Sequence, residues 1–204
     1  MGRTLHTRIL RAEPIPLRIW RKVESVADIM NERFTWTCES LKPSLVTDEE
    51  RRRFKSDSPN DPPIRVYSFT KVANDEWNAL LVVRFWRWVS TLLPDALVKV
   101  YDEGDYIPAG HVVFTAGRVE LDESRIEDRR AYLAEQGLGG FLKQLDVAVA
   151  IAKRHGLYFA EFPGSWVADV DEVVALGLKP SDLKHLSIDE VADRIRFPWQ
   201  KEQG

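Results

Sequence analysis

The chain has 204 residues, of which 44% are apolar and 30% charged, with a formal net charge of −3. This composition, with seven Trp and nine Phe, predicts a packed core, and the weak negative charge argues against binding to bulk nucleic acid. A single cysteine excludes an intramolecular disulfide framework and a cysteine-rich zinc site, so a reducing compartment is expected. No segment has the pattern of a signal peptide or a transmembrane helix, which predicts a cytoplasmic protein without membrane contact.

The first part of the chain is basic. Residues 3–22 hold six Arg or Lys residues against one acid, and Leu5 to Leu10 and Pro16 to Trp20 have the pattern of short strands. Pro14 and Pro16 predict that at least one of these strands lies at a sheet edge, because proline cannot donate a ladder hydrogen bond. The favoured interpretation is a solvated strand face. A phosphate- or RNA-binding arm is the alternative, although aromatic residues for base stacking are nearly missing from this stretch.

Two helices are predicted next. Val23 to Leu41 has apolar residues at helical spacing, and Pro43 ends it. Thr47 to Glu50 has the pattern of the capped start of a short polar helix, which continues into a run of basic residues.

The stretch from Ile64 to Leu121 is predicted to form the centre of the fold, on which the rest of the chain packs. Ile64 to Thr70 alternates apolar and polar residues and predicts a strand, and Leu97 to Tyr101 predicts another. Between them, residues 74–93 are apolar over most of the girth of a helix, which is typical of a core helix covered on two or more sides. Strand, helix and strand in this order predict a parallel βαβ unit. His111 to Thr115 and Arg118 to Leu121 then predict a hairpin, with Gly117 supplying the positive φ of its turn.

The C-terminal part is predicted to be mainly helical. Ser124 to Gln136 is a charged amphipathic pattern that ends at Gly137, and a second helix is predicted over residues 140–155. Its inner face is expected to carry Phe141, Leu145, Val149 and Ala152. A strand at 157–162 and short helices at 170–176 and 187–195 complete the prediction.

These elements predict an α+β fold, or an irregular α/β fold. We expect a mixed sheet of five to seven strands, packed by two main helices at 74–93 and 140–155. The chain is predicted to be a single domain, 1–204, with 163–204 as a candidate helical appendage at its C-terminal end.

Acidic residues are concentrated between positions 102 and 128, where eight acids face two arginines. Three interpretations remain open: a plain turn, a divalent-metal site using Asp102, Asp105 and Glu120, or a docking surface for a basic partner. The candidate partner-binding residues are Asp102, Glu103, Asp105, Glu120, Asp122 and Glu123.

Catalytic and cofactor motifs are missing from the sequence. The four histidines are widely separated, so neither a zinc site nor a catalytic triad is indicated. Gly137 to Gly140 precedes a helix but follows a helix rather than a strand, which argues against a phosphate-binding loop. No catalytic residue, resident metal or cofactor is therefore predicted, and a non-enzymatic role is favoured.

The segment Val98 to Glu120 (VKVYDEGDYIPAGHVVFTAGRVE), which follows the Trp-rich helix, resembles bacterial immunity proteins that protect against polymorphic toxins. It is also similar to related uncharacterised bacterial α+β proteins. The resemblance covers about a quarter of the chain, at the level of pattern. It implies a small, cytoplasmic, cofactor-free protein that binds one toxin domain.

Three functional hypotheses follow. The first is a protein-binding module, an immunity protein that neutralises a basic toxin domain through an acidic face. The second is a metal-dependent hydrolase or nuclease that uses the carboxylates of residues 102–128. The third is a nucleic-acid-binding accessory factor that works through the basic N-terminal strands. The sequence disfavours the third because of the net charge.

Overall fold

The structure is a computed structural model of the 204-residue chain. It describes residues 3–33, 41–53, 59–72, 76–102, 111–121 and 123–155. The strand predicted at 157–162, the two short helices after it and the appendage at 163–204 lie outside the described residues. None of the described helices is long and apolar enough to cross a membrane.

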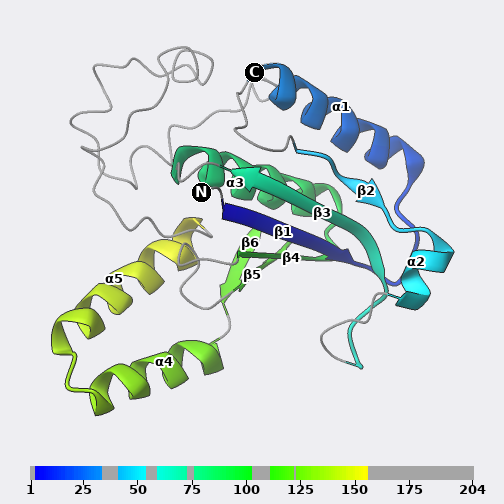
Figure 1. The fold of residues 1–204 in the computed structure, drawn as a ribbon. Helices are drawn as coiled ribbons and strands as arrows, with labels where there is room; N and C mark the ends of the chain where they lie inside the picture. Colours follow the sequence, from blue (N-terminus) through cyan, green and yellow to red (C-terminus); the bar gives the residue numbers. More distant parts are fainter. Residues whose placement is uncertain are drawn as a thin grey trace.

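Within the described residues, six strands form one sheet in the order β2-β3-β1-β4-β5-β6 (Figure 1). Their bounds are β1 Arg3–Leu10, β2 Ser44–Leu45, β3 Ile64–Val72, β4 Leu97–Asp102, β5 His111–Thr115 and β6 Arg118–Leu121. The helices are α1 Leu17–Arg33, α2 Asp48–Arg53, α3 Glu76–Leu92, α4 Glu123–Glu135 and α5 Gly139–His155. The α+β class, the strand number and the two main helices were thus predicted from the sequence.

The N-terminal strand β1 occupies the centre of the sheet. It pairs antiparallel with β3 on one side and with β4 on the other. Strands β3 and β4 therefore run parallel, as predicted, but they are not neighbours, and every described pairing is antiparallel rather than mixed. The expectation that an N-terminal strand lies at a sheet edge was wrong. Pro14 and Pro16 follow β1, so they remove no ladder donor from it.

The main core lies between one face of the sheet and the helices α1 and α3. Alternate residues of β1, Leu5 and Ile9 among them, are buried on this face, and α3 contributes Phe85 and Trp86. Those two rings meet edge to face, with centroids 4.9 Å apart. Phe114 of β5 is fully buried in the same cluster. The prediction of a helix covered on several sides agrees with this burial.

Helix α1 begins earlier than the sequence suggested. The segment Pro16 to Trp20 was expected to be a strand, but the amides of Ile19 and Trp20 both donate to the carbonyl oxygen of Pro16, and the helix runs from Leu17. Pro16 sits just before the first helical residue, where a missing N–H costs no hydrogen bond. Over five residues an apolar alternation fits either structure, and burial of Trp20, Val23 and Met30 against the sheet selects the helix.

The predicted start of α2 is confirmed in detail. The backbone N–H of Thr47 donates to the Glu50 carboxylate at 2.9 Å, and the Glu50 N–H donates to the Thr47 hydroxyl oxygen at 3.2 Å. This reciprocal pair is a capping box, which satisfies two amides that the first helical turn leaves without partners.

The turn between β5 and β6 is held against α3. Ala116 and Gly117 both have positive φ, 49° and 81°, which matches the twist of a two-residue hairpin. The Gly117 N–H donates to the Ser90 hydroxyl at 2.9 Å, and Arg87 donates to the Gly117 carbonyl oxygen at 2.8 Å. The hairpin predicted from the sequence is therefore fixed in place by two hydrogen bonds from the core helix.

Helices α4 and α5 form a hairpin that extends from the β6 side of the sheet (Figure 1). Ile126, Leu145 and Val149 make a small separate core, which Leu121 of β6 joins to the sheet. Gly137 ends α4 with a positive φ of 67°, as predicted, and the N–H of Leu138 donates back to the carbonyl oxygen of Leu133 at 2.9 Å. Leu145 and Val149 face inward as expected, but Phe141 does not, since 55% of it is exposed.

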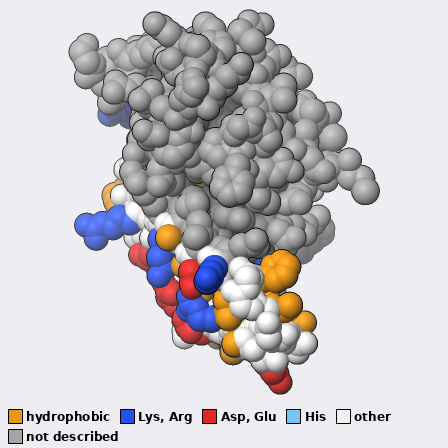
Figure 2. All heavy atoms as spheres, turned by 90° about the vertical axis from the view of Figure 1, so that its left-hand side faces the viewer, with side chains coloured by type: hydrophobic (Ala, Val, Ile, Leu, Met, Phe, Trp, Pro, Cys, Tyr) orange, Lys and Arg blue, Asp and Glu red, His pale blue; other side chains and the backbone are white. Residues whose placement is uncertain are grey.

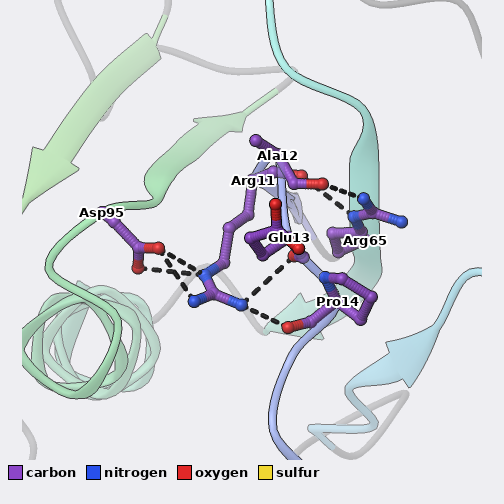
Figure 3. A network of polar contacts seen from close by, with 6 residues as sticks. All are labelled: Arg11, Ala12, Glu13, Pro14, Arg65 and Asp95. Carbon is purple, nitrogen blue, oxygen red and sulfur yellow. Dashed lines mark hydrogen bonds and ion pairs between the residues drawn. The ribbon is translucent and has the colours of Figure 1, made fainter.

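Arg11 connects the segment after β1 to the loop before β4 (Figure 3). Its guanidinium donates to both carboxylate oxygens of Asp95, at 2.9 Å from Nε, and to the carbonyl oxygens of Glu13 and Pro14. Arg65 of β3 donates to the carbonyl oxygens of Arg11 and Ala12. The two arginines thus fix the path of the chain from the central strand to α1.

The Arg11–Asp95 pair makes stability depend on pH in a defined direction. Hydrogen bonds from Arg11 lower the pKa of Asp95. The ionised carboxylate therefore stabilises the folded protein at pH values above the ordinary pKa of Asp. This stabilisation is lost as the pH falls through the pKa of Asp95 in the folded state. Because the Asp95 side chain is 53% exposed, we expect Asp95→Asn to cost at most about 1 kcal/mol at pH 7. The difference from wild type should begin to shrink below about pH 4 and disappear below the lowered pKa of Asp95 in the folded protein.

Urea unfolding at pH 7, 5, 4 and 3 measures this difference. Asp28→Asn, at an exposed position of α1, is the matched control and should show no such convergence with the wild type. A wild-type advantage over Asp95→Asn that grows as the pH is lowered would contradict the assignment.

Candidate functional site: the acidic end of the sheet

The topology brings the two acidic segments of the sequence to the same end of the sheet. Strand β4 ends at Asp102, where Tyr101 pairs with His111 at the start of β5. Strand β6 ends at Leu121, which pairs with Val112. Val112 in turn pairs with Val100, so the backbones at Asp102 and Leu121 are two strand spacings apart across the sheet and two residues apart along it, roughly 12 Å in all. The ends of β4 and β6, some twenty residues apart in the sequence, are therefore separated by one strand, β5.

Three of the six candidate residues lie in the described part of the chain. Asp102 is the last residue of β4, Glu120 is exposed on β6, and Glu123 is the exposed first residue of α4. We call these three residues the acidic end of the sheet. Glu103, Asp105 and Asp122 lie outside the described residues.

Helix α5 partly neutralises this charge. Lys153 Nζ lies 2.7 Å from the Glu123 carboxylate, and Arg130 pairs with both Glu127 and Asp146, the latter at 2.6 Å. These carboxylates raise the pKa of Arg130 through hydrogen bonds, with Asp146 contributing most. Exposed pairs of this kind add little stability, but each cation reduces the local negative potential. Glu120 and Asp128 also remain exposed near the start of the hairpin.

The metal interpretation gains no support from the described residues. Within residues 3–33, 41–53, 59–72, 76–102, 111–121 and 123–155, no group of three or more His, Cys, Asp or Glu side chains is placed to hold a metal ion. Asp105, one of the three proposed ligands, lies outside these ranges.

The basic N-terminal strand gains aromatic neighbours in the fold. The His6 ring stacks on Tyr101 of β4, with centroids 4.9 Å apart and planes 10° from parallel, and its Nδ1 lies 2.9 Å from the Tyr67 hydroxyl. Arg8 lies over the Tyr101 ring, 5.3 Å from its centroid. These side chains are half-buried and engage one another, so they join three strands together. This arrangement favours the structural interpretation over a nucleic-acid-binding arm.

Sequence reasoning missed one surface, at the turn between α4 and α5. Tyr132, Leu138 and Phe141 are exposed there by 59%, 38% and 55%. Figure 2 faces the hairpin and shows apolar side chains at its surface beside charged ones. Apolar residues in a predicted helix are normally assigned to a core. These three side chains are exposed instead, because the hairpin extends beyond the sheet that would cover them.

Comparison of the chain with models of known protein families, with curated proteins and with solved structures found no match.

Proposed function

We propose that the protein is a non-enzymatic binding module, a cytoplasmic immunity protein that neutralises a toxin domain by docking the acidic end of the sheet against a basic cleft. One observation carries the proposal: the sheet topology brings the backbones of Asp102, Glu120 and Glu123 to the same end of the sheet. A surface with an excess of negative charge accelerates association with a basic partner and suppresses docking of partners with like charge.

The packing of β6 supports the proposal. Leu121, the last residue of β6, packs on both the main core and the small core of the hairpin. A preformed surface binds without the cost of ordering its side chains and loops.

Charge reversal tests the acidic end directly. We expect the double variant Asp102→Lys and Glu120→Lys to lower the association rate with the partner about tenfold or more at low salt, because steering attraction becomes repulsion. At high salt the difference should shrink, since the Debye length falls to about 3 Å at 1 M. Association kinetics of purified proteins at several ionic strengths measure both effects.

The matched control is Asp28→Lys with Glu32→Lys, which makes the same charge change at exposed positions of α1. The control should retain the wild-type salt dependence. Equal association rates for the two double variants would overturn the assignment of the acidic end.

The immunity role has its own test. The partner is isolated by affinity purification of the tagged protein from its native host and identified by mass spectrometry. Expressed alone, this partner should arrest growth, and co-expression with the wild-type chain should restore it. A partner that is harmless when expressed alone would overturn the immunity role and leave the binding role standing.

A further inference from the structure

Three hydroxyl side chains interrupt the apolar residues of the two central strands. Thr7 of β1 and Ser68 and Thr70 of β3 are buried, with at most 2% of each residue exposed. Each lies an even number of positions along its strand from a residue of the main core, Leu5 or Val66. Strand residues at this spacing share a face, so the three hydroxyls lie on the face that α1 and α3 cover. We call Thr7, Ser68 and Thr70 the hydroxyl cluster.

The ladder between β1 and β3 makes these side chains neighbours. Thr7 pairs directly with Ser68, and Thr70 pairs with Leu5, two residues before Thr7. Directly opposed side chains of antiparallel strands have Cβ atoms about 4.5–5.5 Å apart, and diagonal neighbours are about 7–8 Å apart or somewhat less. The three hydroxyl groups therefore surround one small region between the two strands.

Two of these hydroxyls have no hydrogen bond within the described part of the chain. Oγ1 of Thr7 and Oγ1 of Thr70 are both buried side-chain oxygens without a partner. Ser68 Oγ donates to the carbonyl oxygen of Lys42 at 3.2 Å, and its lone pairs can still accept a hydrogen bond. A buried hydroxyl that gains no hydrogen bond destabilises the folded protein, because folding removes the bond it made to solvent.

We propose that the hydroxyl cluster is a buried hydration site. One ordered water molecule bridges the Thr7 and Thr70 hydroxyls, donates to Ser68 Oγ and occupies the volume beside this small side chain. Two hydrogen bonds of about 2.7–2.8 Å that meet at a water oxygen span roughly 4.5–5.5 Å, which fits neighbouring side chains in a ladder. Three partners are the usual number for a buried water. The site lies in the core and is independent of the proposed function.

Thr7→Val and Thr70→Val test the site, because valine keeps the shape of threonine and removes its hydroxyl. Each variant should raise the equilibrium constant for unfolding about tenfold in urea at pH 7, since the water loses a partner while the other hydroxyls stay buried. The double variant should unfold with nearly the same constant as either single variant. Independent sites would give about a hundredfold increase instead, so the shared water is measured as a coupling between the two substitutions.

Thr4→Val is the matched control, because Thr4 is half-buried on the opposite face of β1. It should change the unfolding constant by no more than about twofold. Single variants at Thr7 and Thr70 that are as stable as the wild type, or more stable, would overturn the site by showing that the hydroxyls lie in a dry core. A hundredfold increase in the double variant would overturn the shared water.

A crystal structure of the wild-type chain tests the site without any variant. We expect electron density for one water oxygen within about 3.0 Å of the side-chain oxygens of Thr7, Ser68 and Thr70. A direct hydrogen bond between the hydroxyls of Thr7 and Ser68, with no density for a water beside them, would overturn the proposal.

Discussion

Replacing Phe114 with alanine is expected to lower the free energy of unfolding by about 3–5 kcal/mol. Phe114 is fully buried on β5, in the same cluster as Phe85 and Trp86 of α3, and it pairs across the ladder with Val98. Alanine removes the burial of the ring and leaves a cavity that the surrounding sheet and helix cannot fill completely. Urea unfolding followed by tryptophan fluorescence and circular dichroism measures the change.

Phe141→Ala is the matched control for this prediction, because it deletes the same ring from an exposed position in the first turn of α5. Its effect should stay within about 0.5 kcal/mol, as for other exposed positions. Similar losses for the two variants would show that Phe114 is not part of the main core, or that Phe141 is buried.

Gly117→Ala is expected to destabilise the protein by about 1–3 kcal/mol. Two effects combine at this position. The backbone φ of 81° is unfavourable for a residue with a Cβ, and an added Cβ would lie 2.8 Å from Cγ2 of Thr91 on α3. Because Gly117 also exchanges hydrogen bonds with Ser90 and Arg87, relief of the clash would lengthen the contacts that hold the turn.

Gly137→Ala separates the two effects. Gly137 has a similar positive φ of 67°, but an added Cβ there meets nothing within 4 Å. Its cost should therefore be the smaller one, close to the conformational penalty alone. Adding Thr91→Ala to Gly117→Ala should recover part of the loss. Equal losses at the two glycines, with no recovery, would contradict the clash. Thermal and urea unfolding of the three variants and of the wild type give these values.

Short-range signals in the sequence identified the local structures well. The Thr47–Glu50 capping box, the Ala116-Gly117 turn and the stop at Gly137 all depend on residues within four positions of one another. Local backbone preference and a nearby hydrogen bond are enough to determine each of them. The spacing of apolar residues likewise identified α3 as a core helix. This spacing can be read from the sequence without knowing which elements pack against the helix.

Long-range features could not be predicted in the same way. The alternation of apolar residues in β1 predicts a strand but not its neighbours, so its place between β3 and β4 was missed. The pairing of Lys153 with Glu123 joins residues thirty positions apart, and a count of charges along the sequence overstates the negative potential there. The location of Asp102 and Glu120 at the same end of the sheet could not be derived, because a sequence does not give the order of strands.

The central position of β1 has a consequence for biosynthesis. Strand β1 leaves the ribosome before both strands that flank it, because β3 and β4 follow it in the chain. At 5–20 residues per second, translation takes roughly 5–20 s to pass from β1 to the end of β4. Until β3 has been made, Leu5 and Ile9 have no ladder partner, and until α3 and β4 have been made the core that covers them is incomplete. The sheet therefore closes around a strand that is made before its neighbours, and a nascent chain halted before residue 97 lacks one of the two strands that flank this centre.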